Sequence, residues 1–269
     1  MEPGTARRRA LVTGASSGIG LAFARVLAEH GHDLVLTARR QERLESLAAD
    51  LRGAFGVDVV VIADDLADAE SPARLVSAIA QRTLSIDVLV NNAGFGVPGS
   101  YANTSWRQQG DFLQVLVVAV AELTHRLLPG MVERRWGRII NVASLAGLMP
   151  GVAGHTLYAA SKSFLISFSE SLARETAAHG INVTATCPGF TFSEFHDVTG
   201  TRAQMNRMPR FMWLDAESVA RGAYDAVSAG VTVYVPGRVN RSIAALGRVL
   251  PRRVVSALMQ RNARNFRRV

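Results

Sequence analysis

The sequence predicts one α/β domain built on a doubly wound parallel sheet of about seven strands, with helices on both faces. Short apolar runs alternate with longer amphipathic stretches over residues 9–235, which is the pattern of repeated strand–helix units. The apolar runs are nearly continuous, as expected of strands covered on both faces. No linker and no internal repeat divides the 269 residues, so a single domain is the simplest interpretation.

Composition fits a globular protein with a sizeable core, since 48% of the residues are hydrophobic and 19% are charged. The longest apolar run, residues 115–121, is far shorter than the roughly 20 residues that span a bilayer. No apolar leader precedes the first strand, and the single Cys187 has no partner for an internal disulfide. These features favour a cytoplasmic, reducing location.

The first predicted strand, residues 9–13, ends in a glycine-rich loop, and an amphipathic helix follows over residues 21–30. This order is typical of dinucleotide binding, because glycines let the backbone approach a pyrophosphate and the helix N-terminus offers it unpaired N–H groups. The loop reads Gly14-Ala15-Ser16-Ser17-Gly18-Ile19-Gly20.

Arg39 and Arg40 follow the second predicted strand, residues 33–37. An acidic residue near this position would hold the ribose 2′-hydroxyl of NAD, whereas arginine attracts a 2′-phosphate. We therefore expect NADP as the cofactor. The alternative is that the two arginines only begin the solvated helix predicted over residues 41–51.

The remaining elements continue the alternation. Ser71-Pro72 predicts a helix start with Ser71 as its cap. Ser144 and Pro188-Gly189 follow the ends of two strands, so we expect them to meet the glycine loop at the carboxyl edge of the sheet. Long helices are expected over residues 105–134 and 154–179, and further strands over residues 57–62, 86–90, 138–142, 181–187 and 232–235.

Tyr158 and Lys162 stand four residues apart, so on the predicted helix their side chains share one face. An ammonium beside a phenol, whose free pKa is about 10, favours the phenolate and suits it to proton transfer. Taken alone, the pair fits two surface neighbours better than an acid/base pair. Lys162 is, however, the only lysine among 30 basic residues, and arginine does not reproduce its compact charge. This indicates that a lysine is required there.

Together these motifs resemble the short-chain dehydrogenase/reductase family over about residues 8–235. They are Thr13-Gly14 to Gly20, Asn91-Asn92-Ala93-Gly94, Ser144, Tyr158-x-x-x-Lys162 and Pro188-Gly189. The resemblance implies a Rossmann-type domain that exchanges hydride between NADP(H) and a carbonyl or alcohol. It implies Tyr158 as the acid/base, Lys162 as the group that lowers its pKa and binds the nicotinamide ribose, and Ser144 as the holder of the substrate oxygen.

The same resemblance implies a homo-oligomer, either a dimer or a tetramer, and a set of cofactor contacts. Asp65 would contact the adenine, and Asn91 the sheet and the cofactor ribose. The full set of implied contacts is Gly14, Ser16, Ser17, Gly18, Ile19, Gly20, Arg39, Arg40, Asp65, Leu66, Asn91, Ala93, Gly94, Tyr158, Lys162, Pro188, Gly189 and Ser193.

Three positions depart from the family pattern. Leu116 stands where many members have an asparagine that holds a water of the proton relay, and leucine has no hydrogen-bonding group. The segment from Ser144 to Tyr158 is one residue longer than usual, and Ser193 replaces a threonine. Leu116 supports the alternative function, an NADP-binding sensor or interaction protein with weak turnover.

We predict a domain over residues 1–237 that includes a substrate lid over residues 190–214. Large apolar side chains in the lid indicate a hydrophobic substrate, and packing of the lid onto the domain explains them equally well. These side chains are Phe190, Phe192, Phe195, Met205, Met208, Phe211, Met212 and Trp213. His155 and His196 lie near the expected cleft, but their spacing predicts no metal site.

A basic helical tail is predicted over residues 238–269. No acidic residue follows Asp225, so the formal charge of +8 belongs to this tail, and we expect no nucleic acid at the active site. Its arginines are Arg238, Arg241, Arg248, Arg252, Arg253, Arg261, Arg264, Arg267 and Arg268. Docking of one apolar face onto the domain is favoured over a membrane-surface or polyanion contact. That face consists of Val254, Val255, Leu258 and Met259.

Overall fold

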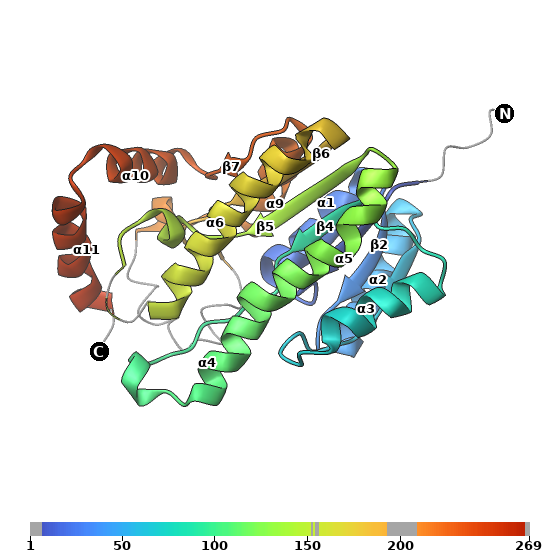
Figure 1. Ribbon diagram of the computed structural model, residues 1–269, viewed down its shortest axis with the longest axis horizontal. Coiled ribbons are helices and arrows are strands. Elements are labelled where there is room, and N and C mark those ends of the chain that lie inside the picture. Colours follow the sequence, from blue (N-terminus) through green and yellow to red (C-terminus); the bar gives the residue numbers. More distant parts are fainter. Residues whose placement is uncertain (1–6, 152, 154–155, 193–208, 267–269) are drawn as a thin grey trace.

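A computed structural model describes residues 7–151, 153, 156–192 and 209–266 (Figure 1). The predicted sheet is confirmed: seven strands lie in the order β3-β2-β1-β4-β5-β6-β7, and every neighbouring pair is parallel. The strands are β1 Arg9–Thr13, β2 Asp33–Thr37, β3 Val59–Val61, β4 Val88–Asn91, β5 Gly137–Val142, β6 Ile181–Thr186 and β7 Val233–Tyr234.

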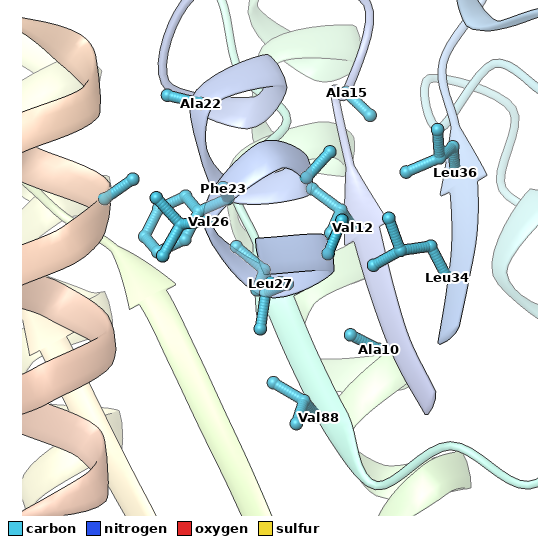
Figure 2. Packing of buried hydrophobic residues seen from close by; sticks show 14 of the residues in the cluster. Ala10, Val12, Ala15, Ala22, Phe23, Val26, Leu27, Leu34, Leu36 and Val88 are labelled. Atoms are coloured by element: carbon cyan, nitrogen blue, oxygen red, sulfur yellow. The ribbon is translucent and has the colours of Figure 1, made fainter. Parts of the chain in front are cut away.

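Helices cover both faces of the sheet, as predicted. One face carries α1 (Gly18–Glu29), α2 (Gln41–Phe55) and α9 (Ala216–Ser228), whose buried residues form one apolar cluster with the strands. The other carries α3 (Ser71–Gln81), α4 (Trp106–Leu113), α5 (Ala119–Glu133) and α6 (Thr156–Thr176). Figure 2 shows Phe23, Val26 and Leu27 of α1 beside Val12 and Leu34.

The continuous apolar character of the strands follows from this double cover. In β1, Ala10 and Val12 face the α1 side while Leu11 belongs to the cluster on the opposite face. Side chains of a strand alternate between faces, so both sets must be apolar when helices cover both. The same alternation holds in β2, where Leu34 and Leu36 lie opposite Val35.

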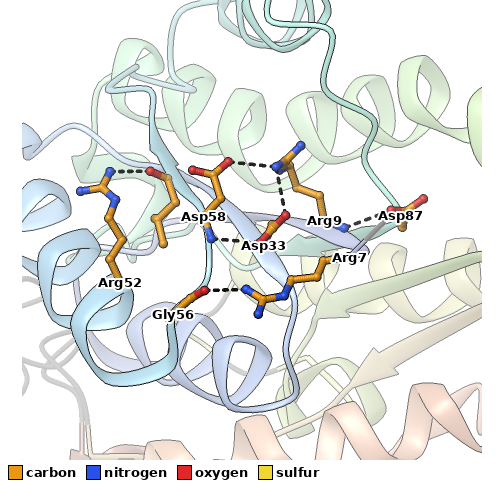
Figure 3. Close-up of polar contacts among 8 residues, drawn as sticks. Arg7, Arg9, Asp33, Arg52, Gly56, Asp58 and Asp87 are labelled. Atoms are coloured by element: carbon orange, nitrogen blue, oxygen red, sulfur yellow. Dashed lines mark hydrogen bonds and ion pairs between the residues drawn. The ribbon is translucent and has the colours of Figure 1, made fainter. Parts of the chain in front are cut away.

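Arg9 ties the amino edge of the sheet together (Figure 3). Its guanidinium lies 3.1 Å from the Asp33 carboxylate at the start of β2 and 2.9 Å from that of Asp58, just before β3. Its backbone N–H donates to Asp87, which precedes β4. The two ion pairs and this hydrogen bond connect the starts of four strands, at the edge opposite the strand ends where the site motifs lie.

The predicted long helix differs from a uniform α-helix at its middle. It runs as α4, a π-helical turn over Gln114–Val118 and α5, and it begins with a capping box between Ser105 and Gln108. The whole run Trp106–Glu133 is long and apolar enough, by length and composition alone, to cross a bilayer. Core helices also meet this criterion, and Leu116 and Leu123 pack in the core.

Two further expectations need correction. Ser71 does not cap α3: Glu70 occupies the cap position without a side-chain bond, and Pro72 falls within the first turn. The helix predicted over residues 154–179 ends at Thr176 and continues as the 3-10 turn Ala177–His179. The tail forms two helices, α10 (Arg238–Val249) and α11 (Arg252–Phe266).

Candidate active site

The glycine loop lies at the switch point of the sheet, where β1 and β4 are neighbours and the chain leaves them toward opposite faces. Gly14 and Gly18 have φ of +66° and +55°, a region that favours glycine. A Cβ on Gly20 would overlap the carbonyl oxygen of Gly14. No side chain caps the first turn of α1, so its N–H groups are available to an anion.

Thr13 and Asn92 fix this loop, and the sequence motifs contained both without assigning them a role. The Thr13 hydroxyl accepts the N–H groups of Asn92 and Ala93, each at 3.0 Å, and donates to the Val90 carbonyl. The Asn92 side-chain amide donates to the carbonyls of Thr13 and Gly14, at 2.9 and 3.3 Å. The loops after β1 and β4 therefore form one unit.

Asn91, expected to contact both the sheet and the cofactor ribose, lies inside the protein. Only 3% of it is exposed, and its amide donates to Asn141 at 2.9 Å and to Thr124 at 3.2 Å. Asn141 in turn donates to the Ser169 hydroxyl of α6. The expected contact of Asn91 with the sheet is thus present. It forms part of a buried chain of hydrogen bonds from β4 through β5 to α6.

Arg40 extends over the glycine loop. Its guanidinium donates to the hydroxyl of Ser16 at 3.0 Å and to that of Ser17 at 3.0 Å. Arg40 thereby connects the end of β2 to the loop after β1. Its positive charge lies where it could bind the 2′-phosphate of a dinucleotide. Arg39 is exposed beside it.

Asp65 and Leu66 follow β3 at the same edge of the sheet. Asp65 is exposed, and its carboxylate accepts the Ala67 N–H at 3.1 Å. Leu66 is only 7% exposed and packs in the apolar cluster around α3, so its side chain serves the core.

Lys162 is buried beneath Tyr158. Its amino group donates to the Val142 carbonyl at 2.7 Å and lies 5.8 Å from the centre of the Tyr158 ring. Burial lowers the pKa of Lys162 from 10.5 to about 8, and the nearby Cys187 opposes this only weakly. The lone lysine of the chain is therefore a core residue, 7% exposed, and not one of two surface neighbours.

Ser144 stands two residues beyond Val142, at the start of the 3-10 turn Leu145–Leu148. Its hydroxyl oxygen accepts the Ala146 N–H at 3.2 Å, which leaves the hydroxyl proton to donate elsewhere. Gly147, which the sequence did not single out, brings this turn against α6. A Cβ at Gly147 would lie 2.6 Å from the Lys162 carbonyl carbon. Ser144 and the Tyr158–Lys162 turn are thus brought together.

Pro188 and Gly189 join the site from β6. The Pro188 carbonyl accepts the Leu145 N–H at 2.9 Å. A Cβ at Gly189 would overlap the side chain of Asn240, a buried residue of α10 that donates to the Pro236 carbonyl. The first tail helix therefore forms part of the wall next to the site, which the sequence did not indicate.

Leu116 lies at the π-helical turn and borders the site. Its Cγ is 3.6 Å from the position of a Cβ on Gly94, and only 1% of it is exposed. π turns inside α-helices occur frequently at functional sites. The turn also contains the buried amide nitrogen of Gln114, which bonds no described residue. The structure thus places an apolar side chain and a local change of backbone pairing where the family pattern has an asparagine.

The described ends of the lid close on each other. Thr191 pairs with Leu214, and the Trp213 ring lies 4.6 Å from that of Phe192 in a stacked arrangement. Phe190 also packs on Trp213, and we call Phe190, Phe192, Trp213 and Leu214 the lid base. Phe192 is still 47% exposed, and Phe211 is 71% exposed. Outside the described residues lie Ser193, Phe195, His196, Met205, Met208, Gly154 and His155. In the described part of the chain, no group of three or more His, Cys, Asp or Glu residues could hold a metal ion.

Comparison with known proteins decides the family. The model of the short chain dehydrogenase family matches residues 8–203. The chain belongs to this family. Nodulation protein G of Rhizobium sp. (strain N33) is 38% identical over 235 residues, which cover 86% of this chain and 93% of that protein. The granaticin polyketide synthase putative ketoacyl reductase 1 of Streptomyces violaceoruber is 42% identical over 192 residues, 70% of each chain.

Solved structures agree with this assignment. A short-chain dehydrogenase from Sphingobium yanoikuyae, determined in complex with NADPH, is 28% identical and superposes with a TM-score of 0.79. The match covers 91% of this chain and 96% of that one. The protein is an oxidoreductase of the short-chain dehydrogenase family, and the sequence-based assignment is confirmed.

The pKa of Lys162 is directly measurable, because the chain has one lysine. We expect protein labelled with ¹³C at the lysine Cε to give one resonance that titrates with a midpoint of about 8. The native state then binds fewer protons than the unfolded state between pH 8 and 10.5, so the free energy of unfolding should rise with pH across this window. At about 1.4 kcal/mol per pKa unit, the rise is at most about 3–4 kcal/mol.

Lys162→Met provides the matched control, because it keeps the buried stem and removes the titrating group. Its free energy of unfolding should lack the rise between pH 8 and 10.5. A lysine resonance that titrates near 10.5 in the wild type would contradict the burial seen here.

Proposed function

We propose that the protein is an NADP(H)-dependent dehydrogenase or reductase that acts on a carbonyl or secondary alcohol of a hydrophobic substrate. The observation that carries this is the buried amino group of Lys162 beneath Tyr158, next to Ser144 at the end of β5. The NADPH bound by the Sphingobium relative and the ketoacyl reductase name of the Streptomyces relative support the cofactor and the reaction class.

The dinucleotide site fits this chain. The loop from Gly14 to Gly20 would hold the pyrophosphate, because Gly20 has no room for a side chain and the N–H groups of α1 are uncapped. Arg39 and Arg40 would hold the 2′-phosphate, and Asp65 would contact the adenine. NADP(H), when bound, supplies or accepts the hydride.

Tyr158 would exchange the proton with the substrate oxygen. The Lys162 ammonium favours the phenolate of Tyr158, since an opposite charge stabilises the charged form. The free hydroxyl proton of Ser144 would donate to the same substrate oxygen and hold it in line with the phenol. In reduction, Tyr158 gives up its proton to the oxygen. In oxidation, it takes the proton back.

The hydrophobic substrate class rests on the walls of the site. Leu148 ends the 3-10 turn that starts after Ser144 and packs on the cluster of Ala143 and Cys187, while Phe190, two residues after Pro188, packs on Trp213. Apolar walls with a few placed polar groups are typical of small-molecule sites. The rival function, an NADP-binding sensor, rests on Leu116. NADPH binding measured beside NADPH oxidation over a panel of carbonyls separates the two, because a sensor binds NADPH and reduces none of them.

Cofactor selection tests Arg39 and Arg40. The wild type should bind NADPH up to roughly a hundredfold more tightly than NADH, since two charge-assisted contacts contribute about 1.5 kcal/mol each. The double variant Arg39→Ala/Arg40→Ala should bring the two dissociation constants together. Arg82→Ala, an exposed arginine at the end of α3, should leave the ratio unchanged. Equal affinities in the wild type would argue against NADP.

Removal of the phenol tests the acid/base. Tyr158→Phe deletes the transferable proton at almost constant volume, so NADPH binding should persist while turnover falls about 100-fold or more. Tyr101→Phe, at a tyrosine that is 48% exposed, is the matched control and should turn over normally. Near-normal turnover of Tyr158→Phe would assign the proton to another group.

Leu116 tests proton supply. If return of a proton to Tyr158 through water limits turnover of the wild type, Leu116→Asn should raise steady-state turnover. Leu116→Met should not raise it. Burying an amide without partners costs about 1–3 kcal/mol, so thermal unfolding should be followed alongside. Hydride transfer in a single turnover that is already as slow as steady state, with no solvent deuterium effect, would show that proton supply is not the limit.

A further inference from the structure

Helix α10 has three distinct faces. Asn240 and Ala244 are buried against the domain. Val239, Leu246 and Val249 follow at helical spacing on another side and are 37%, 57% and 82% exposed. Arg241 and Arg248 are exposed between these two faces. A helix that only docks onto its domain needs one apolar face, and α10 carries a second one toward solvent.

Helix α11 continues the exposed surface. Val255 is buried, but Val254 and Leu258 are 44% and 54% exposed, and Leu250 before the helix is 37% exposed. The expectation that Val254, Val255, Leu258 and Met259 dock together is therefore wrong for two of the four. We call the exposed set Val239, Leu246, Val249, Leu250, Val254 and Leu258 the tail surface. Figure 1 shows α10 and α11 at one end of the molecule, away from α2 and α3.

Positive charge surrounds the tail surface. Arg238, Arg241, Arg248, Arg252 and Arg253 are exposed, and none forms an ion pair with another residue that the structure describes. No acidic residue follows Asp225 in the sequence. Exposed apolar side chains with arginines at their border, in a segment whose sequence has no acid, match the interface of an anionic bilayer.

We propose that the tail surface binds anionic lipid bilayers and that the protein takes its hydrophobic substrate from the membrane. A second copy of the chain is disfavoured as the occupant, because two such surfaces would bring unpaired arginines against each other. A nucleic acid would use the arginines but would leave the apolar side chains in water.

The position of α10 connects this surface to the active site. Asn240 packs on Gly189, and Gly247 packs on Met149, which follows the 3-10 turn of Ser144. Gly237, just before α10, packs on Leu214 of the lid base. A bilayer held on α10 and α11 would thus lie next to Gly189, Met149 and Leu214, which border the proposed active site. This last step rests on the proposed function, whereas the binding to lipid does not.

Vesicle flotation tests the binding with the full chain. The wild type should float with phosphatidylcholine vesicles that contain about 30% phosphatidylglycerol, float weakly with phosphatidylcholine alone, and be released at about 1 M salt, where the Debye length is about 3 Å. Arg241→Gln/Arg252→Gln should weaken partitioning about 25-fold, since each arginine near such a surface contributes about fivefold. Leu246→Ser/Val249→Ser should weaken it at least about tenfold.

Matched controls lie on the far side of the fold. Phe55→Ser removes an apolar side chain that is 40% exposed, and Arg82→Gln removes an exposed arginine; both should float like the wild type. Absence of flotation at low salt, or an equal loss in the controls, would overturn the proposal. A second result would also overturn it. If light scattering shows that the wild type is a dimer, that Leu246→Ser/Val249→Ser is a monomer and that neither binds vesicles, the tail surface joins two copies of the chain.

Activity assays keep the two proposals separate. For a ketone embedded in vesicles, kcat/KM should fall in Leu246→Ser/Val249→Ser, while for a water-soluble ketone it should equal that of the wild type. If the wild type reduces the soluble ketone but does not float with vesicles, the lipid proposal is wrong and the proposed function is unaffected. Flotation without reduction of any ketone would support lipid binding and count against the reductase.

Discussion

The burial of one ammonium group organises the half of this protein that holds Ser144 and Tyr158. Lys162 donates to the last carbonyl of β5, and that bond fixes α6 against the end of the sheet. Gly147 then allows the turn after Ser144 to rest on the backbone of Lys162 itself. Because burial disfavours the charged form, the pKa of Lys162 is lowered. The ammonium group lies 5.8 Å from the centre of the Tyr158 ring, close enough to stabilise its phenolate.

A second constraint, the close contact between the loops after β1 and β4, fixes the glycine loop. Gly20 contacts Gly14, and the Asn92 amide donates to the consecutive carbonyls of Thr13 and Gly14. The buried chain from Asn91 through Asn141 to Ser169 then reaches α6, the helix that carries Tyr158. The half that holds the glycine loop and the half that holds Tyr158 are therefore joined by hydrogen bonds through the core and not only by the chain.

The sequence predicted the sheet, its parallel direction and most strand positions, because double burial leaves a continuous apolar pattern in each strand. It also identified the loops that meet at the carboxyl edge. It did not reveal Gly147 or Asn240, since both act by close packing between segments far apart in the chain. The π turn at Leu116 and the failure of Ser71 as a cap likewise depend on how neighbouring turns pack, which local residue preferences do not encode.

Cys187 has a consequence for the chemistry of the whole chain. It is fully buried at the end of β6, and burial raises its pKa to about 12. A thiol reacts with oxidants and electrophiles as the thiolate, so burial and the raised pKa make this one poorly reactive at neutral pH. The protein consequently carries no reactive sulfur nucleophile of its own. A cysteine introduced at any exposed position would be the sole target of a maleimide probe, with the native residue left in place.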